Sequence, residues 1–366
     1  MTDPATGGPE GTPVSAAAPA PAVAPVPPAP SVPPADAPAP PVPPAHALAP
    51  TPVRATAGQR LLAGSLAAGV AILRRLPEGL VYRAAWHAGL LLARLLPERR
   101  RRVRANLRRV VTYLAAEGMG TERARAAATD PALLDRCVRE VFGHWLVTYA
   151  ESAIGASYST EVLRTRITHA DPAAVAAGLA AVPAGALGRI YTGIHFGAVE
   201  IAGLYAARCG HVPLAAPMET VANPALQAYF ERTRGALGVD VLPLKGATAI
   251  ARDRLARGLG IAFVADRAMA GGGARVPFFG ATAKVPAGPA VLAADTGAPM
   301  AFIAMRRLAF GRWESSLEMA VPDTTLPRRE RAEALLRDHV RWMERMVASA
   351  PEQWWTLLFP IWEDEP

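Results

Sequence analysis

The sequence predicts an α/β protein in which a mixed, mostly parallel sheet is flanked by helices. The first observation is that, after Ala184, short apolar runs alternate with segments of helical character. Strands that alternate with helices imply crossover connections and helices packed on the faces of a largely parallel sheet. The second is a helical periodicity from Pro131 to Arg166, with apolar residues three and four positions apart. The third is a pair of apolar stretches between residues 61 and 96, which predict N-terminal helices.

Composition divides the 366 residues into three parts. Half of the prolines, 18 of 36, fall within residues 1–52. Because alternating Ala and Pro cannot form a helix, we expect residues 1–53 to be an extended, disordered tail that acts as a spacer. Residues 54–130 are assigned to an N-terminal helical segment and residues 131–366 to the α/β domain.

Individual elements follow from the apolar periodicity. Six segments are expected to be strands: Gly188–Ile194, Val212–Pro217, Val239–Leu244, Ile261–Ala265, Met300–Met305 and Ser315–Val321. Four segments between them are expected to be helices: Gly197–Arg208, Pro224–Leu237, Ala247–Arg257 and Pro286–Thr296. Asn223 before Pro224 is typical of a helix start, with an N-cap residue followed by proline at the first helical position.

The chain is basic, with a formal charge of +8, and nearly all of its basic residues are arginines. Arginine stays charged and binds phosphate with a planar fork, which favours anionic partners. A genomic codon bias toward Arg gives the same excess with no partner. Cys137 and Cys209 stand 72 positions apart without a Cys/His cluster. We therefore expect no disulfide scaffold, no metal site and a reducing, cytosolic setting.

The N-terminal apolar stretches, Leu61–Leu73 and Trp86–Leu96, are shorter than the roughly 18 to 20 residues that a membrane span needs. Seven arginines follow within the eleven positions 99–109. This combination predicts helices that associate with an anionic membrane surface. The expected membrane contacts are Arg99, Arg100, Arg101, Arg102, Arg104 and Arg108. A solvated charged helix is the alternative, and nucleic-acid binding is expected least because no aromatic-interleaved basic platform accompanies the arginines.

The segment from Ile190 to Glu200 contains the residues with the clearest chemical potential. A hydrophobic strand ends at His195 and a helix begins near Gly197, so the imidazole is expected at the carboxyl edge of the sheet. His195 and Glu200 can meet only if His195 precedes the helix and turns back toward it. Glu200 would then accept a hydrogen bond from one ring nitrogen while the other nitrogen removes a proton from a hydroxyl. A strand-end His with an unrelated Glu is the alternative interpretation.

The motif from His195 to Glu200 resembles the His-x4-Asp/Glu signature of membrane glycolipid and phospholipid acyltransferases. Over roughly residues 60–364 the chain is most similar to the lipid A biosynthesis (lauroyl/myristoyl) acyltransferase family, which includes the phosphatidylinositol mannoside acyltransferases. Further motifs at family-like spacing are Arg104 to Arg108, Asn223-Pro224, Ala265-Asp266-Arg267, Phe278-Phe279-Gly280, Pro286 to Pro289 and Pro351 to Trp355. Two departures are Ala198-Val199 in place of the usual Asn-Trp, and the acidic ending Trp362-Glu363-Asp364, which is more like the mannoside enzymes.

This resemblance implies a glycerolipid-acyltransferase-like fold and acyl transfer from a thioester, acyl-CoA or acyl carrier protein, to a hydroxyl of a membrane glycolipid. The reaction is expected at the cytoplasmic face of the bacterial plasma (inner) membrane, without a metal or bound cofactor. His195 is the implied general base and Glu200 its orienting partner. Asp266 is expected to order its loop rather than to take part in proton transfer.

Five other residues are expected to bind substrate. Arg234, Arg267 and Lys284 would contact phosphates, and Phe278 with Phe279 would line an acyl groove or else pack in the core. One alternative function is a lysophospholipid or glycerolipid acyltransferase, against which stands the absence of that group's Phe-Pro-Glu-Gly motif. The other is a non-catalytic peripheral membrane protein that binds anionic lipids through residues 99–109.

Overall fold

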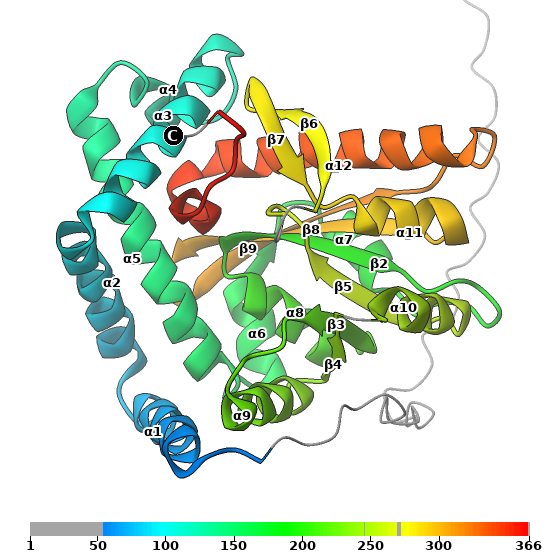
Figure 1. Ribbon diagram of the computed structural model, residues 1–366, viewed down its shortest axis with the longest axis horizontal. Helices are drawn as coiled ribbons and strands as arrows, with labels where there is room; N and C mark the ends of the chain where they lie inside the picture. The colour runs from blue at the N-terminus through cyan, green and yellow to red at the C-terminus, as the bar shows by residue number, and fades with distance from the viewer. Residues whose placement is uncertain (1–53, 245, 269–271, 365–366) are drawn as a thin grey trace, which may run out of the picture. The chain divides into compact units, whose positions relative to one another are not determined.

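A seven-stranded sheet runs through the middle of the folded chain in the order β1-β9-β8-β2-β5-β3-β4 (Figure 1). Its neighbouring strands are parallel except for β8 and β9, which are antiparallel. The computed structural model describes residues 54–244, 246–268 and 272–364, so the predicted tail of residues 1–53 lies outside the described residues. The mixed, mostly parallel sheet predicted from the sequence is confirmed.

The strands of the sheet are β1 (Ile167–His169), β2 (Ile190–Gly197), β3 (Leu214–Met218), β4 (Val239–Pro243), β5 (Gly260–Val264), β8 (Met300–Ala309) and β9 (Arg312–Ala320). A separate antiparallel hairpin consists of β6 (Ala274–Phe278) and β7 (Ala281–Val285). The helices are α1 (Ala57–Leu73), α2 (Glu78–Leu95), α3 (Pro97–Ala116), α4 (Glu122–Ala126), α5 (Pro131–Gly155), α6 (Thr160–Arg166), α7 (Pro172–Leu179), α8 (Val199–Arg208), α9 (Pro224–Gly235), α10 (Ala247–Ala256), α11 (Gly288–Thr296) and α12 (Arg328–Ser349). Two short 3-10 helices, Pro351–Gln353 and Trp355–Leu358, follow α12.

Strand β2 lies between β8 and β5, and its successive side chains enter two different cores. Ile190 belongs to the cluster that also contains Ala293 of α11 and Val340 of α12. The next residue, Tyr191, belongs to a cluster with Ala206 of α8. Helices therefore cover both faces of the sheet, and the carboxyl ends of the parallel strands β2 and β5 meet at one edge.

All six predicted strands are present, as β2, β3, β4, β5, β8 and β9, and the four predicted helices are α8 to α11. Asn223 caps α9 as predicted, because its Oδ1 accepts a hydrogen bond from the Ala225 N–H at 2.9 Å. The helical periodicity predicted from Pro131 to Arg166 is confirmed, and the structure divides this stretch into two helices. It forms α5 and α6, and α6 begins where the Ser159 hydroxyl caps a new first turn.

The helices α1, α2 and α3 all contact α5. The backbones of α2 and α5 come close together at Gly89, where a Cβ would lie 2.3 Å from the Phe142 carbonyl oxygen of α5. From α3, Val103 and Leu107 enter the main hydrophobic core. Within residues 54–244, 246–268 and 272–364, no helix has both the length and the apolar character that crossing a bilayer requires.

The turn between β2 and α8 follows His195 directly and requires glycine. Gly197 has a φ of +55°, and a Cβ there would lie 2.0 Å from the carbonyl oxygen of Met305. The Gly197 carbonyl oxygen accepts a hydrogen bond from Arg307 Nη2 at 3.2 Å. Arg307 is itself paired in the interior with Glu151 of α5, at 2.5 Å. A buried ion pair therefore supports the turn that carries His195.

We expect Gly197→Ala to lower the free energy of unfolding by about 2 kcal/mol or more, because the left-handed backbone and the contact with Met305 both oppose a side chain. Urea denaturation measures this. The matched control is Gly203→Ala in α8, where no atom lies within 4 Å of the added Cβ. That change should be neutral or stabilise by up to about 1 kcal/mol. Equal urea midpoints for Gly197→Ala and the wild-type protein would contradict the constraint described for this turn.

Candidate active site

His195 lies near the carboxyl end of β2, at the sheet edge where ligands bind in open α/β folds. The pairing of β2 with β8 shifts register between Gly193 and Gly197, an irregularity of the kind that re-aims side chains. The His195 side chain is 22% exposed. Its ring meets that of Trp355 at a centroid separation of 4.3 Å, with the planes inclined by 65°. The imidazole is thus held on one side and open to solvent in part.

The partner of the imidazole is Asp266. This residue comes shortly after β5, the strand that pairs with β2. His195 Nδ1 lies 2.6 Å from Asp266 Oδ1. The other carboxylate oxygen, Oδ2, accepts hydrogen bonds from the His195 backbone N–H at 3.0 Å, Trp354 Nε1 at 2.8 Å and the Thr356 hydroxyl at 2.7 Å. The Asp266 side chain is fully buried. Four donors therefore converge on one carboxylate behind the exposed ring.

These contacts determine the charge of Asp266 and the tautomer of His195. Burial alone would raise the pKa of Asp266, but the His195 charge and the hydrogen bonds from His195, Thr356 and Trp354 hold that pKa well below its usual range. An ionised carboxylate only accepts hydrogen bonds, so Nδ1 donates, and whenever the ring is uncharged its lone pair lies at Nε2. No described residue hydrogen-bonds to Nε2. The site thus places one ring nitrogen without a described partner beside an ionised carboxylate.

The predicted contact of His195 with Glu200 is not found. Helix α8 begins only at Val199, so His195 does precede the helix, but its Nδ1 is already bonded to Asp266. Glu200 instead pairs with Arg234 of α9, Nη2 to Oε1 at 3.3 Å, and both side chains are partly exposed. Asp266, expected to order its loop rather than to take part in proton transfer, makes the contact with His195 that was predicted for Glu200. Its position directly after a parallel strand next to β2 was the available signal.

Arg267 and Lys284, two of the predicted phosphate contacts, line a common cavity of about 250 Å³ whose wall also includes Asp266. The Arg267 guanidinium stacks over the Phe359 ring at 4.2 Å, and no described carboxylate forms an ion pair with it. Lys284 lies 3.8 Å from Glu363. Arg234 does not line this cavity and pairs with Glu200, as described above. The three predicted cations are therefore divided between two places.

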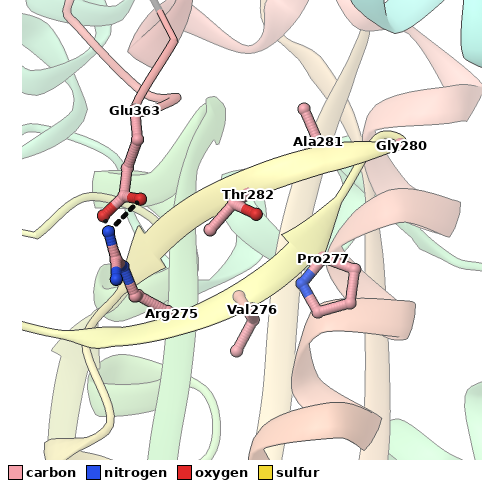
Figure 2. A pocket seen from close by; sticks show the side chains of 7 residues that line it. All are labelled: Arg275, Val276, Pro277, Gly280, Ala281, Thr282 and Glu363. Carbon is pink, nitrogen blue, oxygen red and sulfur yellow. Dashed lines mark hydrogen bonds and ion pairs between the residues drawn. The ribbon is translucent and has the colours of Figure 1, made fainter.

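A larger hollow of about 560 Å³ lies on the β6–β7 hairpin (Figure 2). Arg275 and Glu363 close one end of it with two hydrogen bonds of 2.8 and 2.7 Å. Neither His195 nor Asp266 lines it. Asp266 belongs to the wall of the smaller cavity, although its carboxylate is fully buried, and His195 lines neither cavity. We therefore locate the candidate site at the His195–Asp266 contact, next to the smaller cavity.

Phe278 and Phe279, predicted either to line an acyl groove or to pack in the core, are both fully buried. Their rings pack against each other and against Trp354. Neither borders either of the two cavities. The described contacts are those of core residues that support the C-terminal segment.

The arginines predicted to contact the membrane lie on α3. Arg99, Arg101, Arg102 and Arg108 are exposed, whereas Arg100 and Arg104 are half-buried. Arg101 is paired with Glu98 in the same helix, and Arg104 with Asp135 of α5. Arg104 therefore has a structural partner within the protein.

A mixed, mostly parallel sheet with a His–Asp pair at its carboxyl edge defines an α/β protein equipped for general-base chemistry. The chain belongs to the bacterial lipid A biosynthesis acyltransferase family, whose model matches residues 59–362. It is 33% identical over 110 residues to a phosphatidylinositol mannoside acyltransferase of Mycolicibacterium smegmatis, covering 29% of this chain and 36% of that protein. It is 33% identical over 138 residues to a phosphatidylinositol mannoside acyltransferase of Mycobacterium tuberculosis, covering 37% of this chain and 40% of that protein. The matched segments thus span well under half the length of these relatives.

The lowered pKa of Asp266 predicts a specific acid dependence of stability. Since that pKa is lower in the folded protein than in the unfolded chain, ionised Asp266 stabilises the fold above about pH 4, the ordinary Asp value. This contribution is lost as the pH falls toward the folded-state pKa. The difference in free energy of unfolding between wild type and Asp266→Asn should therefore shrink between pH 5 and pH 3, as measured by urea denaturation. A constant difference across that range would contradict the assignment.

Proposed function

We propose that the protein is an O-acyltransferase that moves a fatty acyl group from an acyl thioester to a hydroxyl of a membrane glycolipid. Membership of the lipid A biosynthesis acyltransferase family supports the class of reaction. The observation that carries the assignment of the site is the 2.6 Å contact between His195 Nδ1 and the buried Asp266 carboxylate, with Nε2 left for a substrate. The co-substrate is proposed to be acyl-CoA or an acyl carrier protein.

In the proposed step, Nε2 of His195 takes the proton of the acceptor hydroxyl as its oxygen attacks the thioester carbonyl carbon. The new C–O bond forms, the C–S bond breaks, and the departing thiolate receives the proton from the imidazolium. An ester and a free thiol result. Asp266 stabilises the imidazolium and keeps Nδ1 protonated, a role served here by its charge and its contact with Nδ1. The pair supplies the base itself, and we propose no metal or bound cofactor.

The phosphates of the two substrates are proposed to bind Arg267, Lys284 and Arg234. Arg267 and Lys284 face one cavity beside Asp266, and the Arg267 guanidinium has no carboxylate partner among the described residues, which suits it for an anion. Arg234 pairs with Glu200 at the start of α8, and both side chains are partly exposed. Arg234 is proposed as a weaker phosphate contact.

The acceptor is proposed to be a glycolipid of the lipid A precursor type or the phosphatidylinositol mannoside type. The names of the two mycobacterial relatives support the second type. A glycerolipid acceptor has less support, since Ala265-Asp266-Arg267 stands where glycerolipid enzymes have Phe-Pro-Glu-Gly, and Asp266 is bound to the imidazole.

We also propose that α1 to α3 rest on the cytoplasmic face of the bacterial plasma membrane. Large apolar side chains are exposed on α1 and α2, among them Leu61 at 72% and Leu95 at 62%. The exposed arginines of α3 follow directly along the chain. Apolar side chains beside guanidinium groups are the combination that binds an anionic bilayer surface.

A set of three variants tests the chemistry. His195→Ala and Asp266→Asn should each lower the rate of glycolipid-dependent thioester consumption by about 100-fold or more, because one removes the base and the other its negative charge. Glu200→Gln should have a smaller effect, since Glu200 does not touch the ring. The measurement is thiol release from acyl-CoA with phosphatidylinositol mannoside or a lipid A precursor as acceptor.

Two outcomes of that assay are contradictory to the proposal. Equal thiol release by wild type and His195→Ala, with liposome binding kept by both, would favour the non-catalytic lipid-binding protein. A larger loss in Glu200→Gln than in Asp266→Asn would make Glu200 the working partner of His195.

The membrane proposal has its own test. Replacing Arg99, Arg101, Arg102 and Arg108 together with Gln should weaken binding to liposomes of anionic lipid, and the remaining binding should depend less on salt. Liposome flotation at low and high salt measures both. The control replaces Arg329 and Arg337 of α12, also exposed arginines on a long helix, with Gln. Unchanged binding by the α3 variant would leave the apolar helices as the only contact.

A further inference from the structure

The C-terminal segment from Trp354 to Thr356 lies against the proposed catalytic pair. Trp354 forms an isolated antiparallel bridge with Phe196, the residue after His195. Trp355 places its ring beside the imidazole, 4.3 Å between centroids. Trp354 Nε1 and the Thr356 hydroxyl donate to Asp266 Oδ2 at 2.8 and 2.7 Å. Three consecutive residues far along the chain from His195 therefore contact the pair.

The two oxygens of the Asp266 carboxylate have different hydrogen-bond partners. Oδ2 receives Trp354, Thr356 and the backbone N–H of His195. Among the described residues, Oδ1 accepts a hydrogen bond only from Nδ1 of the imidazole. A carboxylate bonded in this way cannot rotate about its Cβ–Cγ bond without breaking hydrogen bonds in a buried site, where a lost bond is costly. The direction in which Oδ1 faces the ring is thereby set.

We infer that Trp354 and Thr356 are positioning residues of the proposed acyl transfer, which hold Asp266 so that Oδ1 stays aligned with Nδ1 of His195. This inference rests on the proposed function. Nothing in the sequence motifs assigned these residues a part in the site, because a tryptophan pair near a chain end is as readily explained by packing.

Helix α3 fixes the segment from its other side. Asn106 Nδ2 donates to the carbonyl oxygens of Leu357 and Phe359 at 3.1 and 3.0 Å. Arg109 pairs with Asp364 at 2.8 Å. Figure 1 shows the C-terminal segment, in red, next to α3. The segment that donates to Asp266 is therefore also held by α3, through the two hydrogen bonds of Asn106 and the more exposed Arg109–Asp364 pair.

The competing explanation is that Trp354 and Thr356 contribute to the stability of the fold alone and leave the His–Asp pair unchanged. The two roles differ in what they do to the pH profile. Removing a donor from Oδ2 leaves more negative charge on the carboxylate, so the His–Asp pair binds a proton more tightly at acid pH. The acidic limb of the rate profile should then move to higher pH. A loss of folded protein lowers the rate at every pH without moving that limb.

The test uses Thr356→Val and Trp354→Phe in the full chain, with kcat, KM and the pH profile of thioester consumption as readouts. We expect kcat to fall about tenfold in each, KM to change less than twofold, and the acidic limb to move to higher pH. Thr356→Ser keeps the hydroxyl and should restore the wild-type limb. One control is Thr296→Val, which removes a hydroxyl that bonds to the Leu292 carbonyl oxygen in α11. The other is Trp342→Phe, which removes a buried indole N–H that has no partner in the described part of the chain.

A second readout does not depend on turnover. The proton shared by His195 Nδ1 and Asp266 Oδ1 should give a downfield NMR resonance that is absent in His195→Ala. It should be present in wild type, Thr356→Ser and both controls, and shifted upfield or broadened in Thr356→Val and Trp354→Phe. An unmoved resonance and an unmoved acidic limb in those two variants would overturn the inference. A wild-type protein with the resonance but without any acyl transfer would instead refute the proposed function alone.

Discussion

The site depends on one buried carboxylate. Asp266 is removed from solvent and yet ionised, a state that is costly unless hydrogen bonds replace the lost water. Its donors come from β2 and from the C-terminal segment, which are about 160 residues apart in the chain. The carboxylate therefore does more than orient an imidazole. It also links the centre of the sheet to the C-terminal segment. If the donors from either place were lost, the buried carboxylate would lack hydrogen bonds that replace water, which is costly.

A second buried charged residue, Arg307, bonds to the turn that follows His195. Arg307 bonds to Glu151 and to the carbonyl oxygen of Gly197, and the Trp313 indole completes the coordination of Glu151 at 2.8 Å. The turn after His195 thus rests on an ion pair between β8 and α5. Buried pairs of this kind are weak evidence for stability but demand one geometry. Asp266 accepts from the His195 backbone N–H and Arg307 donates to the Gly197 carbonyl oxygen, so hydrogen bonds hold the backbone on both sides of Phe196.

The sequence was sufficient to locate most strands of the main sheet and insufficient to find the partner of His195. Alternation of strands and helices is a local property, and it located β2, β3, β4, β5, β8 and β9 together with α8 to α11. Elements without a strong local signal were not predicted. The strand β1 has three residues, and α12 is rich in Arg and Glu along the face opposite Leu336 and Val340. Glu200 seemed the partner because it is five positions away, whereas the contact with Asp266 depends on which strand lies beside β2.

Helix α3 has one buried side and one exposed side, and this follows from its composition. Its mean hydropathy is low, yet Val103, Asn106 and Leu107 are buried, so one side of the helix belongs to the protein interior while the arginines occupy the other. The buried side holds the C-terminal segment through Asn106, and that segment holds Asp266. The side proposed to meet the membrane and the carboxylate proposed to serve catalysis are therefore separated by a helix and one short segment. Under the proposed membrane arrangement, a lipid acceptor drawn from the bilayer would reach a site whose geometry depends on the same helix that is proposed to meet that bilayer.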